Sequence, residues 1–214
     1  MQFAKPGMKE AQIAAKVTEI ALAEGGQLSF PVIATINGQT LHNHFHGNTI
    51  NEGQLFLLDA GAESPLGYAG DMSSTFPVAR TFTREQRDIY EVCFNAHNSA
   101  VEMLKPGVHF RDVHLKTASN IFDGMKGLEF TKGNTDVAVE NGAHALFFPC
   151  GLGHLMGLDV HDMENLGEQW VGCKGQPKSK QFGLKSLRLG MELLPGHVLT
   201  IEPGIYFIPQ LIDL

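Results

Sequence analysis

Two aspartates stand where apolar sequence meets a predicted turn. Asp59 ends the run LFLLD, and Asp71 begins the next predicted strand. A carboxylate in such a setting is costly to bury unless a cation or hydrogen bonds compensate its charge. Either aspartate alone is explained by a hydrogen bond to a turn amide, which Asp often accepts. The two together, with acids and histidines in similarly apolar runs elsewhere, favour a functional site over two separate turns.

The segment GLGHLMGLDVHD and the run HVLTIEPGIYFI repeat this pattern. A single histidine among Gly, Leu and Met is more often a satisfied core residue than a ligand. Two of them, His154 and His161, with Asp162 beside the second, indicate a site. Glu202 lies in the middle of the second run, where no backbone-capping role accounts for it.

Three carboxylates and one imidazole make an oxygen-rich ligand set. Such a set suits Mn, Co, Zn or Mg rather than a structural zinc site built from cysteines. Two aspartates close together also indicate a carboxylate that bridges two metals, an arrangement that activates water for hydrolysis. The cluster His42, His44 and His46 offers a second metal site if it lies on a strand, where alternate residues share a face. No acid accompanies the cluster, which favours a substrate-facing role for one of these histidines.

The composition excludes several other classes of protein. The chain has 214 residues and a net charge of −7, which argues against a nucleic-acid surface. No apolar run approaches the roughly 20 residues that a membrane span needs, and the opening MQFAKPGMKE lacks the features of a signal peptide. The three cysteines show no CxxC spacing, so we expect reduced thiols and a cytoplasmic protein.

The elements that position these residues mix helices and strands without a strict βαβ alternation, which predicts an α+β fold. Thr83 and Gln86 form a capping box at the start of a long helix. Residues 123–143 and 165–190 are expected to be loops, with no core role for the second. The remaining predictions are helices over residues 6–26 and 110–122, and strands over residues 30–36, 54–61, 67–78, 144–149 and 198–207, the last bent at Pro203.

Three segments carry a resemblance to a known family. DAGAESPLGYAGDMSSTFPV, GLGHLMGLDVHD and VLTIEPGIYF, in this order, resemble the pita-bread metallopeptidases, above all the Xaa-Pro dipeptidase (prolidase) and aminopeptidase P group. The similarity runs from about Pro6 to the end of the chain, and FGLKSLRLGMELLPGHVLTIEPGIYFI is most similar to the prolidase branch. The resemblance implies an α+β pita-bread fold. It also implies one catalytic domain over residues 1–214 whose last strands are missing.

The resemblance also implies roles for particular residues. His42 and His161 match histidines that orient the substrate and stabilise the developing oxyanion. Glu202 would also manage the proton of a metal-bridging hydroxide that attacks the carbonyl before proline. Four of the five metal-binding residues of the family are matched, by Asp59, Asp71, His154 and Glu202. They would hold two divalent ions, commonly manganese, with cobalt or zinc as alternatives. The expected partners are short proline-containing peptides, and a homo-oligomer is allowed.

Three departures from the family pattern bear on activity. The fifth ligand is a glutamate on a later strand, which the chain does not reach, so we expect one weakly bound metal or none and little hydrolysis. Cys150 occupies a substrate-binding position where relatives usually have histidine, and a thiol does not replace imidazole as a charged donor near neutral pH. Ser74 stands where an arginine often follows Asp71.

These features leave several functions open. The leading reading is an exopeptidase that hydrolyses Xaa-Pro bonds. A second reading is a non-catalytic pita-bread module that binds peptide or a partner protein, which the missing ligand and Cys150 favour. Methionine aminopeptidase and creatinase-like C–N hydrolysis are further activities that the same fold supports.

Overall fold

The computed structural model describes residues 3–78 and 80–213, which form two compact units. Unit 1 runs to Gln86 and also includes Met156–Val160, and unit 2 comprises Arg87–Leu155 and the chain from His161 onward. Both units mix helices with extended segments, which confirms the predicted α+β class. The predicted single domain over residues 1–214 includes residues 1, 2, 79 and 214, which lie outside this description, and it stays a prediction.

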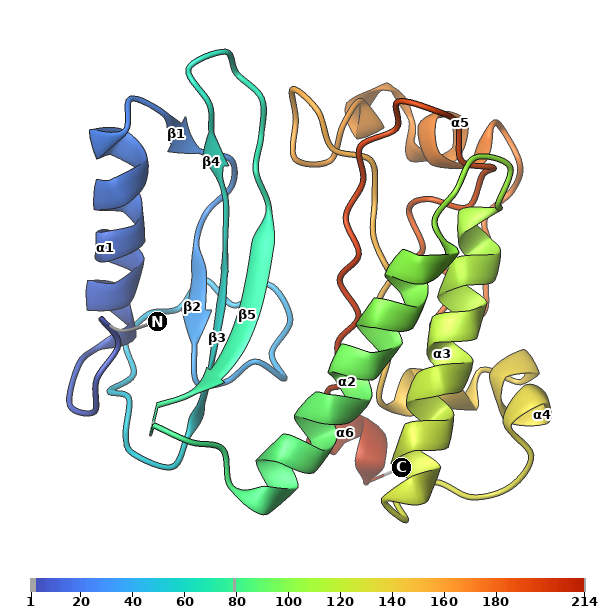
Figure 1. Cartoon of the computed structure of the whole chain (residues 1–214), viewed down its shortest axis with the longest axis horizontal. Coiled ribbons are helices and arrows are strands. Elements are labelled where there is room, and N and C mark those ends of the chain that lie inside the picture. The colour runs from blue at the N-terminus through green and yellow to red at the C-terminus, as the bar shows by residue number, and fades with distance from the viewer. Residues whose placement is uncertain (1–2, 79, 214) are drawn as a thin grey trace. The chain divides into compact units, whose positions relative to one another are not determined.

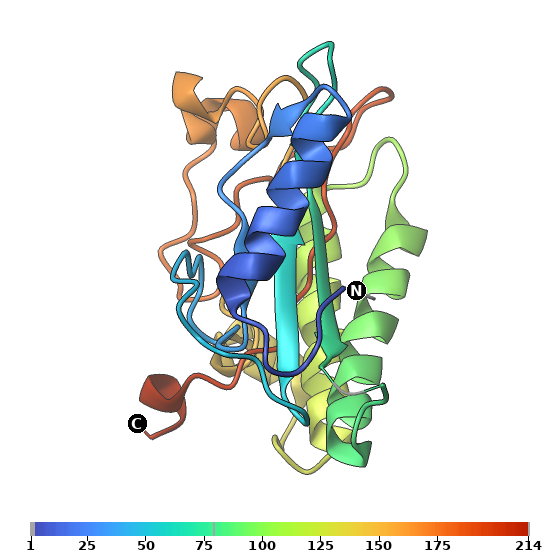
Figure 2. The same ribbon diagram turned by 90° about the vertical axis from the view of Figure 1, so that its left-hand side faces the viewer.

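Unit 1 is a helix packed on a small antiparallel sheet (Figures 1 and 2). The central strand of the sheet pairs with a neighbour on each side, in the order β2-β3-β5. A separate two-stranded pair, β1 with β4, extends this unit. The elements are α1 (Glu10–Ala23), β1 (Gln27–Leu28), β2 (Ile33–Thr35), β3 (Leu55–Ala60), β4 (Ala62–Glu63) and β5 (Met72–Pro77).

Helix α1 is defined at both ends by its neighbours. The amide of Glu10 donates to the carbonyl of Asn48, which satisfies one of the orphan donors of the first turn. At the other end Gly25 has a φ of +81°, which turns the chain so that the amide of Gly26 donates to the carbonyl of Ala21. Ile13 on α1 and Phe56 on β3 are buried in the core between helix and sheet.

Unit 2 is organised around two long helices that lie side by side in Figure 1, α2 (Arg84–Met103) and α3 (Phe110–Gly127). The predicted capping box before α2 is confirmed: Thr83 N–H donates to Gln86 Oε1 at 3.0 Å, and Gln86 N–H donates to Thr83 Oγ1 at 3.2 Å. The helices approach closely at Gly124, where an added Cβ would lie 2.5 Å from a methyl group of Val92. Phe110, Ile121 and Met125 of α3 are almost fully buried in the core of this unit.

Four predicted elements of unit 2 differ from the structure. Residues 123–143 are not a loop, because α3 continues to Gly127 and Asn134 caps a further helix by accepting from the amide of Val137. Residues 144–149 are not a strand, because residues 144–146 belong to a 3₁₀ turn; a short apolar run does not by itself distinguish helix from strand. Residues 165–190 contain helical turns and supply buried core side chains, including Leu189. The elements are α4 (Thr135–Glu140), η1 (Ala143–Leu146), η2 (Glu164–Leu166), α5 (Glu168–Cys173) and α6 (Pro209–Ile212).

The fourth difference concerns residues 198–207, which form no regular strand. The segment is extended and makes a single antiparallel bridge between Leu199 and Leu155. Its amides at Thr200 and Glu202 donate to the carbonyls of His154 and Leu152. Pro203 has no amide hydrogen to donate, and the next amide of this segment that pairs with the earlier chain is that of Tyr206, which donates to the carbonyl of Phe147.

Candidate metal centre

Strand β3 of unit 1 carries Asp59, and Asp71 immediately precedes strand β5. Asp59 lies opposite Ser73 in the antiparallel register, and Asp71 precedes Ser73 by two residues. Opposite residues share a face of a sheet, as do alternate residues along one strand. Asp59 and Asp71 are therefore diagonal neighbours on one face, with Cα atoms about 7–8 Å apart in such a register. This confirms the expectation that a hairpin brings both carboxylates to the same face.

The backbone segments beside these aspartates approach too closely at Gly61 and Gly70 to admit a side chain at position 61. A Cβ added at Gly61 would lie 1.6 Å from the carbonyl oxygen of Gly70, so the two segments can approach only because position 61 is glycine. The Oδ1 atom of Asp59 is inaccessible to solvent. A buried carboxylate oxygen on this face is suited to binding a cation.

The extended segments of unit 2 bring His154 and Glu202 together. His154 Nε2 lies 3.2 Å from Glu202 Oε1, and the imidazole is almost fully buried while the carboxylate is partly exposed. The two residues are held by neighbouring backbone pairs, because the Thr200 amide donates to His154 O at 3.0 Å and the Glu202 amide donates to Leu152 O at 2.8 Å. An imidazole and a carboxylate far apart in sequence thus meet at one point.

The tautomer of His154 follows from its other ring nitrogen. His154 Nδ1 lies 2.9 Å from the carbonyl oxygen of Leu155, an acceptor, so Nδ1 carries a hydrogen. In the neutral ring Nε2 then has a lone pair, and it faces the acceptor Glu202 Oε1. Two acceptors at this distance repel each other unless a proton or a metal cation lies between them. A backbone carbonyl that orients a ligating histidine in this way is a usual feature of metal sites.

His161 packs against this pair in unit 2. Its ring centroid is 4.4 Å from that of His154, with the rings nearly perpendicular. Burial lowers the pKa of His161, and the charges of Arg188 and His154 lower it further, while Glu164 and Glu202 act in the opposite direction. The ring is therefore held in its neutral form to a lower pH than an exposed histidine. An ion pair between Arg188 and Glu164 forms part of its surroundings.

Cys150 lies in the same part of unit 2. Burial raises the pKa of its thiol to about 11, with a further contribution from the negative charge of Glu202 and an opposing hydrogen bond to Tyr206. The thiol is therefore neutral near pH 7. A thiol is either neutral or anionic, so it cannot supply the positive charge that a histidinium would provide at this place.

Comparison with known proteins shows which family the chain belongs to. The profile of Metallopeptidase family M24 matches residues 1–212. The chain belongs to metallopeptidase family M24. Its α+β architecture is the pita-bread fold of M24 proteins, as the resemblance predicts.

The M24 relatives include two kinds of proline-directed peptidase. The chain is 34% identical over 221 residues to the Xaa-Pro dipeptidase of Mus musculus, covering 100% of this chain and 43% of that protein. It is 34% identical over 215 residues to the Xaa-Pro aminopeptidase of Escherichia coli (strain K12), covering 98% of this chain and 44% of that protein. The chain thus spans less than half the length of these curated relatives.

Solved M24 structures agree with this assignment. The zinc-substituted E. coli aminopeptidase P in complex with product matches with a TM-score of 0.82 at 33% identity, over 96% of this chain and 43% of that chain. The proline aminopeptidase P II from Yersinia pestis matches with a TM-score of 0.81 at 34% identity, over 95% of this chain and 43% of that chain. The likeness therefore extends through nearly all of this M24 chain.

The histidine cluster of unit 1 does not form the strand that a histidine-only metal site would need. His42 adopts a left-handed backbone conformation with φ of +52°, and the residues around it form a turn and an irregular loop. His42 and His44 are exposed, whereas His46 is half-buried and Nε2 of its ring contacts the carbonyl oxygen of Val32. In the part of the chain that the structure describes, these three rings do not gather as metal ligands. The role of His42 toward a substrate stays a prediction.

Two contributors to the unit 2 site were not anticipated from sequence. Thr200 contacts both His154 and Glu202, and Arg188 influences the charge state of His161. The spacing of Thr200 and Glu202, two residues apart in an extended run, is a signal for a shared face. Nothing in the sequence around Arg188 indicates that this side chain lies near His161.

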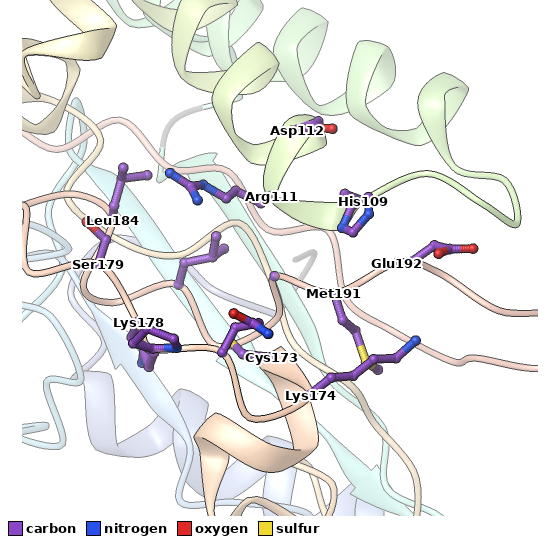
Figure 3. A pocket seen from close by; sticks show the side chains of 14 residues that line it. His109, Arg111, Asp112, Cys173, Lys174, Lys178, Ser179, Leu184, Met191 and Glu192 are labelled. Atoms are coloured by element: carbon purple, nitrogen blue, oxygen red, sulfur yellow. The ribbon is translucent and has the colours of Figure 1, made fainter.

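A separate cavity of about 630 Å³ lies in unit 2 (Figure 3). In Figure 3 His109 and Arg111, at the start of α3, lie on one side of it, and Cys173 and Lys178 lie on the other. None of the predicted site residues lines this cavity, and side chains of both charges, including Glu192, surround it. It is therefore not part of the candidate metal centre.

Proposed function

We propose that this M24 chain is the catalytic part of a metal-dependent exopeptidase that hydrolyses the bond between any residue and proline. Membership of a metallopeptidase family supports metal dependence, and relatives named Xaa-Pro dipeptidase and Xaa-Pro aminopeptidase support the substrate class. The observation that carries the proposal is the facing pair of His154 Nε2 and Glu202 Oε1, at 3.2 Å, with the imidazole oriented by a carbonyl. An oriented imidazole nitrogen and a carboxylate oxygen that face each other have the chemistry of a metal-binding pair.

We propose as ligands the four residues that the sequence indicates, Asp59, Asp71, His154 and Glu202. Carboxylate and imidazole ligands fit manganese, cobalt or zinc, of which we propose manganese. When bound, such ions lower the pKa of a water molecule and polarise the scissile carbonyl.

The remaining site residues act on the substrate and on protons. We propose that Glu202, which is partly exposed, accepts a proton from the attacking water and passes it to the leaving amine. His161, kept neutral by burial, donates a hydrogen bond to the carbonyl oxygen as negative charge develops there. We propose that His42 orients the peptide and that Cys150 contacts it.

The M24 chain loaded with Mn²⁺ is the direct test. We expect it to hydrolyse Leu-Pro or a Leu-Pro-initiated peptide, and a chelator should abolish the activity. His154→Ala should lower kcat/KM by at least about 100-fold, because loss of outer partners of a metal already costs 10- to 100-fold. His44→Ala, at an exposed histidine, is the matched control and should keep the activity. Hydrolysis that survives both the chelator and His154→Ala would show that the proposed function is wrong.

A second candidate function is a non-catalytic module that binds proline-containing peptides. The neutral thiol of Cys150 favours it, because no cationic donor stands at that place. The same assay separates the two functions: peptide binding that persists with Mn²⁺ present but without turnover would support the module.

We also propose a cytoplasmic location, supported by three cysteines with free thiols. Among the described residues no helix is long and apolar enough to cross a membrane.

A further inference from the structure

The hydroxyl of Thr200 lies between the two candidate ligands of unit 2. Thr200 Oγ1 accepts a hydrogen bond from the backbone N–H of His154 at 3.0 Å. The same oxygen lies 2.8 Å from Glu202 Oε1. An amide N–H can only donate, so the hydroxyl acts as the acceptor toward His154. Its single proton is then available for the carboxylate of Glu202, which completes both contacts with one side chain.

The backbone leaves this hydroxyl little freedom to move. Thr200 and Glu202 are alternate residues of an extended segment, so their side chains project to the same side. The Thr200 amide donates back to His154 O at 3.0 Å, which closes a ring of contacts with the His154 segment. The two segments touch at Gly153, where an added Cβ would lie 2.1 Å from the carbonyl oxygen of Thr200. A rigid backbone thus holds the hydroxyl in place.

We propose that Thr200 is a positioning residue that sets the relative orientation of His154 and Glu202 for binding a divalent cation. This inference rests on the proposed function, because it assigns these two side chains as metal ligands. The hydroxyl restrains the Glu202 carboxylate through Oε1 and restrains the His154 backbone through its amide. A side chain of the same shape without a hydroxyl loses both restraints. Residues that hold ligands in place in this way are worth 10- to 100-fold in metal affinity.

The experiment compares three variants with the wild-type chain. Thr200→Val keeps the β-branched shape and removes the hydroxyl, whereas Thr200→Ser keeps the hydroxyl. Thr117→Val is the matched control, because this threonine is buried in α3 of the same unit and its hydroxyl donates only to the backbone carbonyl of Val113 at 2.8 Å. Two quantities are measured: Mn²⁺ affinity by calorimetric titration, and the hydrogen exchange rate of the His154 amide in the metal-free protein.

We expect Thr200→Val to weaken Mn²⁺ binding by about 10- to 100-fold, whereas Thr200→Ser and Thr117→Val stay within about threefold of wild type. In the metal-free protein, the His154 amide of Thr200→Val should exchange roughly 10-fold faster, because it has lost its acceptor. Wild-type affinity in Thr200→Val would overturn the positioning role. An equal loss of affinity in Thr117→Val would also overturn it, by assigning the effect to general destabilisation.

The amide measurement separates this inference from the proposed function. If the wild-type chain binds no Mn²⁺, the proposed function fails, and the exchange rate of the His154 amide then decides the positioning role. Unchanged protection in Thr200→Val would overturn that role. Faster exchange in Thr200→Val alone, with Thr200→Ser like wild type, would support it without any metal.

Discussion

A pair of buried histidines away from the candidate metal centre predicts how stability depends on pH. His114 of α3 and His144 of η1 are 0% and 1% exposed, and their ring centroids are 6.2 Å apart. His114 also packs against the ring of Phe148 at 5.2 Å. Burial lowers the pKa of His114 from 6.5 to about 3, with a further contribution from His144, and burial also lowers the pKa of His144. The folded protein therefore keeps both rings neutral well below pH 6.5.

The size of the effect follows from the two pKa values of His114. Below pH 6.5 the unfolded chain binds a proton that the folded protein does not bind, so the free energy of unfolding falls as the pH is lowered toward 3. The full loss across that range is roughly 4 to 5 kcal/mol. Between about pH 7.5 and about pH 5, His114 alone accounts for about 2 kcal/mol. His144 acts in the same direction.

The variant that tests this is His114→Phe, which keeps an aromatic ring but cannot bind a proton. Urea unfolding is measured at both pH values by the fluorescence of Trp170, which lies in α5 of the same unit and is the only tryptophan of the chain. The wild-type free energy of unfolding should fall by about 2 kcal/mol more than that of the variant. Comparing the two pH dependences cancels any packing cost of the larger ring. The control is His109→Gln, an exposed histidine at the start of α3, which should keep the wild-type pH dependence.

An equal pH dependence in wild type and His114→Phe would refute the reasoning. It would mean that His114 is protonated in the folded protein at pH 5, or that its environment compensates the charge. A reduced dependence in His109→Gln as well would assign the effect to histidines in general rather than to burial.

Three further predictions concern single side chains. Glu10 is fully buried and accepts hydrogen bonds from the two ends of the loop that carries the histidine cluster. Glu10→Ala should therefore lower the free energy of unfolding of unit 1, measured by chemical unfolding, by about 3 kcal/mol. The control Glu19→Ala, at an exposed glutamate, should lower it by less than about 0.5 kcal/mol. Cys150→His should raise kcat of the Mn²⁺-loaded chain by at least about 10-fold by restoring a protonatable donor, and a rate at or below wild type would contradict this. Thr83→Ala should destabilise α2 by about 1 kcal/mol through loss of the capping box, whereas exposed Thr81→Ala should not, as thermal unfolding can show.

The elements that follow strong local signals were predictable. The capping box at Thr83 marks the start of α2 within a residue, and the short apolar run in LFLLDAG identifies β3. The hairpin between β3 and β5 then determines that Asp59 and Asp71 share a face, because strand alternation has a period of two. Local geometry alone settles these features.

Other elements depend on contacts that local patterns do not encode. The run HALFFP has the composition of a strand, yet residues 144–146 belong to a 3₁₀ turn, and Phe147 and Phe148 are buried in the same core as Ile121 of α3. Residues 165–190 look polar along the sequence, but Leu184, Leu187 and Leu189 reach the core of unit 2. In both cases the packing of distant segments outweighs the local preference.

The sequence by itself determined the family, the residue types of the candidate ligands and the shared face of the aspartates, because motifs and strand alternation are properties of contiguous residues. Only the tertiary structure decided that Thr200 joins His154 to Glu202, that Arg188 and Glu164 lie beside His161, and that His114 is buried against His144. Thr200 is 46 residues from His154 and Arg188 is 24 residues from Glu164, whereas His114 and His144 come from different helices. Their meeting is set by how the whole core packs, which no local window of sequence contains.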